Sequence, residues 1–80
     1  MNEYIIYIEL INRNNNKLKV NAVYASKIRE LEMAQELFEQ AISDTKLICN
    51  RASNYSKVII RLIHKDDFFD TEARKEEIKL

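Results

Sequence analysis

The alternation of apolar and polar residues predicts a β-hairpin at the start of the chain. Residues 4–11 are rich in β-branched and aromatic side chains, which are typical of a strand. In residues 17–24, Leu18, Val20 and Ala22 alternate with lysine and asparagine, as in a half-buried strand. The asparagine-rich run between the two segments suits a tight reversal, because asparagine tolerates the left-handed backbone conformation. The two segments are therefore expected to pair.

A helical period follows from residue 26 to residue 43. Apolar residues recur there at steps of three and four and predict one buried stripe. These residues are Ile28, Leu31, Ala34, Phe38, Ala41 and Ile42. Ser26 is a suitable N-cap, since its hydroxyl can accept a hydrogen bond from a free amide of the first turn.

Two more strands are expected after this helix, over residues 46–50 and 57–65. In the second of them, Val58, Ile60 and Leu62 fall on one face. Residues 70–80 contain few apolar side chains, so they predict a short, frayed helix that is ordered only against a partner.

The predicted fold class is α+β, with the order ββαββ and an optional terminal helix. A four-stranded antiparallel sheet would carry the main helix on one face, and we expect the strand order 2-1-3-4. Residues 1–65 would form a single domain, and residues 66–80 an acidic C-terminal segment.

Composition removes several classes of function. The 80 residues include no glycine and no proline. Walker loops, dinucleotide-binding loops and EF-hands need glycine, and PxxP ligands need proline, so no cofactor is expected. The single cysteine, Cys49, cannot form an internal disulfide, and no apolar run approaches the ~20 residues that cross a bilayer. These features favour a cytoplasmic protein.

Charge is balanced in total but segregated along the chain. Thirteen basic and thirteen acidic residues give a net charge of zero. Residues 11–29 and 45–65 contain bases and no acid, whereas residues 30–44 contain acids and no base. The chain can therefore present one positive and one negative surface to a partner. Alternatively, the two kinds of surface neutralise each other within one molecule.

The sheet face turned away from the helix is the expected interaction surface. Alternation places three apolar side chains, one aromatic and two basic ones on it: Ile5, Ile59, Ile63, Tyr7, Lys19 and Arg61. So much apolar surface needs a cover, either the C-terminal segment or another protein, and a homodimer would supply one. We therefore expect a non-enzymatic binding or regulatory module that acts through protein contacts. Its composition suits an accessory protein of a phage or mobile element.

Two other functions stay open. A nucleic-acid-binding protein would contact phosphates through basic residues of the sheet, and a third possibility is a small phosphate binder or enzyme at the start of the main helix. The candidate contacts are Arg13, Lys17, Lys19 and Arg61 for the former, and Lys27 and Arg29 for the latter.

No catalytic or metal site is predicted. Cys49 and His64 are the one thiol and the one imidazole, and the expected strands would separate them by on the order of 17 Å at ~3.3 Å per residue. His64 and the aspartates at 66, 67 and 70 match no zinc-ligand spacing.

Overall fold

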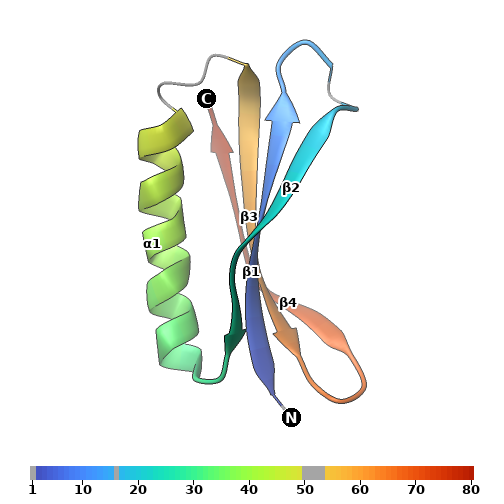
Figure 1. The fold of residues 1–80 in the computed structure, drawn as a ribbon, viewed down its shortest axis with the longest axis vertical. Helices are drawn as coiled ribbons and strands as arrows, with labels where there is room; N and C mark the ends of the chain where they lie inside the picture. Colours follow the sequence, from blue (N-terminus) through green and yellow to red (C-terminus); the bar gives the residue numbers. More distant parts are fainter. Residues whose placement is uncertain (1, 16, 50–53) are drawn as a thin grey trace.

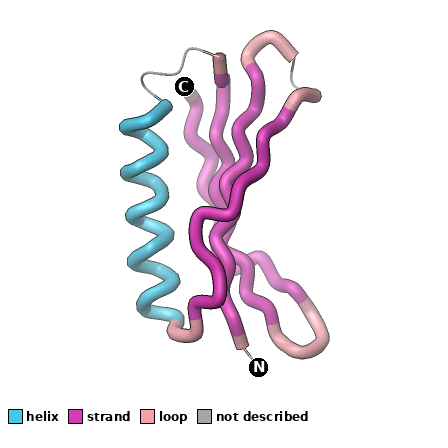
Figure 2. The backbone as a smooth tube through the Cα atoms, viewed as in Figure 1, coloured by secondary structure: helices cyan, strands magenta, loops and turns pink. Residues whose placement is uncertain are grey.

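The protein is a four-stranded sheet with one helix packed on it. A computed structural model describes residues 2–15, 17–49 and 54–80. In chain order, the elements are β1 (Glu3–Asn12), β2 (Lys19–Ile28), α1 (Leu31–Cys49), β3 (Tyr55–Lys65) and β4 (Asp70–Lys79). All neighbouring strands are antiparallel, in the order β2-β1-β3-β4, and α1 runs along one face (Figures 1 and 2). The α+β class and the order ββαββ are confirmed, although three of the expected elements, the main helix, the strand 46–50 and the terminal helix, differ in position or type.

The main helix begins later than predicted. β2 continues to Ile28, which pairs with Tyr4 of β1 and is buried in the core. Ser26 is therefore a strand residue and not an N-cap. The first helical hydrogen bond runs from the Ala34 amide to the Glu30 carbonyl (3.0 Å), so α1 starts only after β2 has ended.

The same helix also ends later than predicted. The segment 46–50, expected to be a strand, is helical through Cys49, and residue 50 lies outside the described residues. The buried stripe of Ala34, Phe38 and Ala41 gains Thr45 one helical turn further on. A short apolar run cannot by itself distinguish a strand from a buried helix, and here the helical period continued through it.

The C-terminal segment is a strand and not a frayed helix. β4 pairs with β3, with Ile78 opposite Val58 and Arg74 opposite Leu62. Its alanine, arginine, lysine and glutamate residues are good helix formers, so pairing with β3 overrides the local preference. As a consequence, residues 70–79 extend the sheet sideways instead of folding across its free face.

The core lies between α1 and the sheet face that α1 covers, called the inner face below. Phe38 of α1 and Ile6, Ile60 and Leu62 of the strands are completely buried there. Arg74 joins β4 to the helix: its guanidinium lies 4.5 Å from the centre of the Phe38 ring, and its Nη2 is 2.8 Å from Glu39 Oε1. The opposite, helix-free side of the sheet is called the outer face.

Candidate interaction surface

The outer face is less apolar at its surface than expected. Ile5, Ile11 and Ile59 lie on it, but each is less than 10% exposed, and Ile63 is half-buried. Tyr7 remains exposed. Neither the C-terminal segment nor any other described part of the chain lies across this face (Figure 1), so the cover must come from neighbouring side chains of the sheet itself.

Ion pairs provide that cover. Arg61 Nη1 is 3.5 Å from Glu9 Oε2, and Arg61 Nε donates to Glu72 Oε1 at 3.2 Å. Lys19 Nζ is 3.8 Å from Glu9 Oε1. The long apolar stems of lysine and arginine can shield aliphatic neighbours from water while their charged ends stay solvated. The two cations predicted for the outer face, Lys19 and Arg61, thus have carboxylate partners within the chain.

The other basic candidates do not gather on one surface. Arg13 ties the β1–β2 loop to β3, since its Nη2 donates to the Tyr55 carbonyl at 3.2 Å. Lys17 is exposed in the same loop. Lys27, at φ 57°, and Arg29 lie near the end of β2, before α1 begins. They are therefore not in the first helical turn, where the phosphate-binding alternative expected them.

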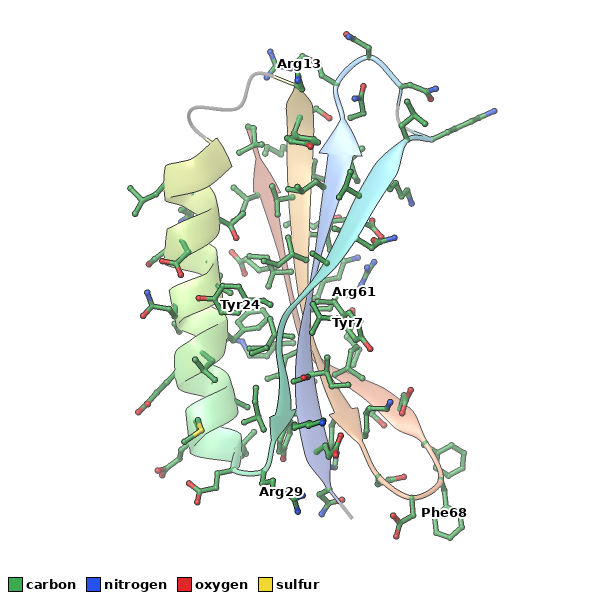
Figure 3. All side chains as sticks on the ribbon, in the orientation of Figure 1. Tyr7, Arg13, Tyr24, Arg29, Arg61 and Phe68 are labelled. Carbon is green, nitrogen blue, oxygen red and sulfur yellow. The ribbon has the colours of Figure 1, made fainter. Side chains whose placement is uncertain are left out.

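Figure 3 shows Arg13 and Arg29 at opposite ends of the molecule. A nucleic-acid backbone is contacted best by a continuous basic stripe. The two groups of cations are separated by a region where Lys19 and Arg61 pair with Glu9. The candidate cations consequently form no continuous basic stripe from one end of the molecule to the other.

The two edges of the sheet differ sharply in charge. Seven of the ten residues of β4 are charged, against two of ten in β2. Charged residues along an edge strand discourage pairing with other chains. On β2 and just before it, Leu18, Val20 and Val23 are each at least half exposed. The segment from Leu18 to Val23, called the open edge below, is thus the less protected of the two edges.

A bulge limits the open edge. The β1–β2 register shifts around Tyr24, between the pairs Ile6–Ala25 and Tyr7–Val23. The Tyr24 hydroxyl donates to Asp44 Oδ2 of α1 at 2.6 Å; this bond raises the pKa of Tyr24 and lowers the pKa of Asp44. The part of β2 that follows the bulge is thereby held against α1. The part of β2 that precedes the bulge diverges from the helix (Figure 1).

The β3–β4 hairpin presents a feature that the sequence pattern did not assign. Phe68 and Phe69 are 86% and 72% exposed at its turn. The C-terminal segment was one of two possible covers for the outer face, but β4, which follows these residues, turns back beside β3 instead. The signal was present in the sequence as two adjacent phenylalanines among aspartates, after a run of strand character.

The groups considered for chemistry do not converge. Cys49 is the last residue of α1, whereas His64 lies near the end of β3 and stacks on Tyr4 with ring centres 4.8 Å apart. The His64 Nε2 is buried and has no hydrogen-bond partner among the residues that the structure describes. Across residues 2–15, 17–49 and 54–80, no three histidine, cysteine, aspartate or glutamate side chains are grouped so that they could hold a metal ion.

The single helix of the described residues lacks the apolar length needed to span a bilayer. No protein-family model matches the chain, and no curated protein or solved structure is similar enough to it to count as a match.

Proposed function

We propose that this chain is a non-enzymatic protein-interaction module that binds an extended segment of another protein along β2. The observation that carries the proposal is the unequal protection of the two sheet edges. β4 is densely charged, while β2 combines an unpaired edge with exposed Leu18, Val20 and Val23. An added strand gains main-chain hydrogen bonds from such an edge and specificity from the side chains beside it.

The open edge offers apolar contacts on both sides of an added strand. Val20 pairs with Leu10, which packs against the core, so Val20 belongs to the inner face. Val23 pairs with Tyr7 and belongs to the outer face. A strand bound here would therefore bury valine side chains above and below its own plane, which favours a partner segment with alternating apolar residues.

Charge indicates the kind of partner segment, and composition indicates the setting in which the protein acts. Lys19 and Lys27 are the charged residues of β2, so a partner segment with acidic residues at its ends would be oriented by them. The single cysteine supports a cytoplasmic setting, and the composition supports an accessory or regulatory role in a phage or mobile element.

Placing lysines on the open edge is expected to abolish partner binding. The variant Val20→Lys/Val23→Lys adds charge where the partner's apolar side chains would pack, and both positions are at least half exposed, so the fold should persist. Leu47→Lys, at a 69% exposed position of α1, is the matched control. Immobilised protein is used to capture partners from the native host, and circular dichroism checks folding.

Wild type and Leu47→Lys should retain the same captured protein, and the double variant should lose it. Equal capture by all three proteins would contradict the proposal. Capture of nucleic acid instead, with affinity that falls steeply between two salt concentrations, would favour the phosphate-binding alternative.

A further inference from the structure

The turn of the β3–β4 hairpin exposes two phenylalanine side chains to solvent, and hydrogen bonds fix its backbone. Asp66 Oδ1 accepts hydrogen bonds from the amides of Phe68 (2.7 Å) and Phe69 (2.6 Å), and the Asp66 amide donates to the Phe69 carbonyl (3.0 Å). These bonds also lower the pKa of the Asp66 carboxyl. The aromatic tip, defined as residues 66–69, is therefore fixed before any partner arrives, which reduces the entropy lost on binding.

The aromatic tip is surrounded by negative charge. Asp66, Asp67 and Asp70 lie at the turn, next to Lys65. An anionic lipid surface would repel such a tip. The chemistry that fits it is an apolar hollow with a rim of ammonium or guanidinium groups, because such a site accepts the rings and neutralises the carboxylates.

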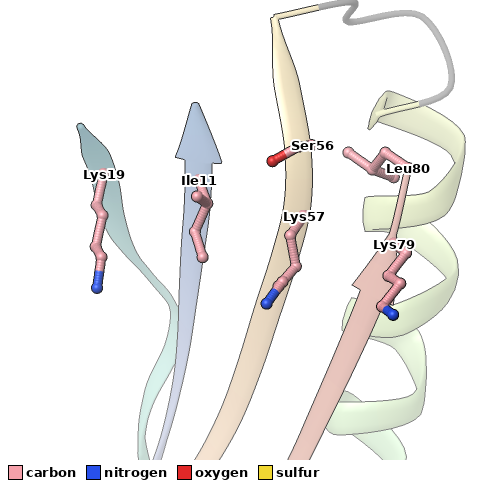
Figure 4. A pocket seen from close by; sticks show the side chains of 6 residues that line it. All are labelled: Ile11, Lys19, Ser56, Lys57, Lys79 and Leu80. Atoms are coloured by element: carbon pink, nitrogen blue, oxygen red, sulfur yellow. The ribbon is translucent and has the colours of Figure 1, made fainter. Parts of the chain in front are cut away.

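A hollow of this kind exists at the other end of the sheet. Three lysines from three different strands, Lys19, Lys57 and Lys79, line a depression of about 460 Å³ together with Ser56 and the apolar Ile11 and Leu80 (Figure 4). Ile11 is opposite Lys19 on one side and Lys57 on the other, and Lys57 is opposite Lys79. We call this site the lysine hollow.

The lysines of the hollow are only loosely paired within the chain. The Lys19–Glu9 and Lys57–Glu77 distances are 3.8 and 3.9 Å. Strong ammonium–carboxylate hydrogen bonds are about 2.7–2.9 Å long. These ammonium groups can therefore turn toward carboxylates of another molecule at little cost.

The positions of the tip and the hollow fit a two-fold arrangement. Lys57 and Asp66 are nine residue steps apart along and just beyond β3, about 30 Å at ~3.3 Å per residue. The β3–β4 hairpin leans away from α1 (Figure 1), and the hollow is rimmed by outer-face lysines. If two copies stack outer face against outer face with their strands antiparallel, each tip reaches the hollow of the other copy.

We propose that two copies of this chain form a closed dimer in which the aromatic tip of each enters the lysine hollow of the other. Both contacts form at once because the two-fold axis exchanges them, so the assembly does not grow further. Four phenylalanine side chains and the surface they cover amount to about 1,200–2,000 Å², the range of a specific interface. The edge backbone of β2 and the inner-face Val20 stay available, so the dimer adds to the proposed function without depending on it.

Removing the rings is expected to dissociate the dimer. Phe68→Ser/Phe69→Ser should weaken self-association by about 30-fold or more, as for anchor residues of other interfaces. Leu31→Ser/Met33→Ser, at two half-exposed positions of α1, is the control and should associate as wild type does. Sedimentation equilibrium measures the mass against the 9.5 kDa of one chain.

A charge exchange tests the contact directly. Asp67→Lys/Asp70→Lys and Lys57→Glu/Lys79→Glu should each be monomeric alone, and mixing them should restore a dimer that contains one of each. A monomeric wild type, an unchanged dimer in the phenylalanine variant, or a mixture that stays monomeric would each overturn the proposal. Val20→Lys, on the inner face of the open edge, should still dimerise and should lose the captured partner, so failure of this proposal and failure of the β2 proposal are distinguishable.

Discussion

Replacing Phe38 by alanine is expected to remove a large share of the free energy of unfolding of the protein. The ring is completely buried between α1 and the inner face, and it also supports the Arg74 guanidinium. Truncation of a buried phenylalanine typically costs about 3–5 kcal/mol. An 80-residue domain has a free energy of unfolding of about 4–12 kcal/mol in total, at ~0.05–0.15 kcal/mol per residue.

Urea denaturation followed by circular dichroism measures the effect. Leu47→Ala, at an exposed position of the same helix, is the control and should change the free energy of unfolding by less than about 0.5 kcal/mol. A loss below about 1.5 kcal/mol for Phe38→Ala would contradict the core described here, because that loss is typical of a side chain with partial burial.

Replacing Ile59 by aspartate is expected to cost about 3–4 kcal/mol, although Ile59 lies on the helix-free face. The side chain is only 6% exposed, and its strand neighbours are Glu9 on one side and Glu77 on the other. The substitution removes a buried isoleucine, worth about 1.5–3 kcal/mol, and places a third carboxylate between two others.

Two further variants separate these causes. Ile59→Lys should cost less than Ile59→Asp, since its stem can cover the site and its ammonium lies between two carboxylates. Val23→Asp, on the same face but 56% exposed, should cost less than about 1 kcal/mol. Equal losses for Ile59→Asp and Val23→Asp in thermal denaturation would show that the outer face has no packed layer.

The strands with many apolar residues could be predicted from the sequence. β4 could not, because its order depends on pairing with β3. β1 and β3 are rich in β-branched and aromatic residues, and Leu18, Val20 and Ala22 alternate with polar residues around the start of β2, so these strands were recognisable from the sequence. β4 has one large apolar side chain among its ten residues, Ile78, and its order depends on β3 and on the contacts of Arg74 with Phe38 and Glu39. Such contacts join residues far apart in sequence, and no local period reports them.

The candidate surface was predicted in outline only. Alternation correctly assigned Tyr7 and Arg61 to the face away from the helix. It could not reveal that Glu9 would pair with both Lys19 and Arg61, because that contact joins β1 to β2 and β3 at once. The exposure of the open edge depends on where α1 lies over the sheet, and the exposure of Phe68 depends on β4 turning back beside β3. Both exposures depend on tertiary structure and not on the local sequence.

Hydrogen exchange of the β2 amides tests the central claim most directly. It is measured by NMR on the free protein and on its complex with the captured partner. An added strand must hydrogen-bond to the outward backbone groups of β2, so alternate amides between Lys19 and Val23 should exchange more slowly in the complex, while those of β4 stay unchanged. Slower exchange confined to β4 or α1, with β2 unaltered, would contradict the account.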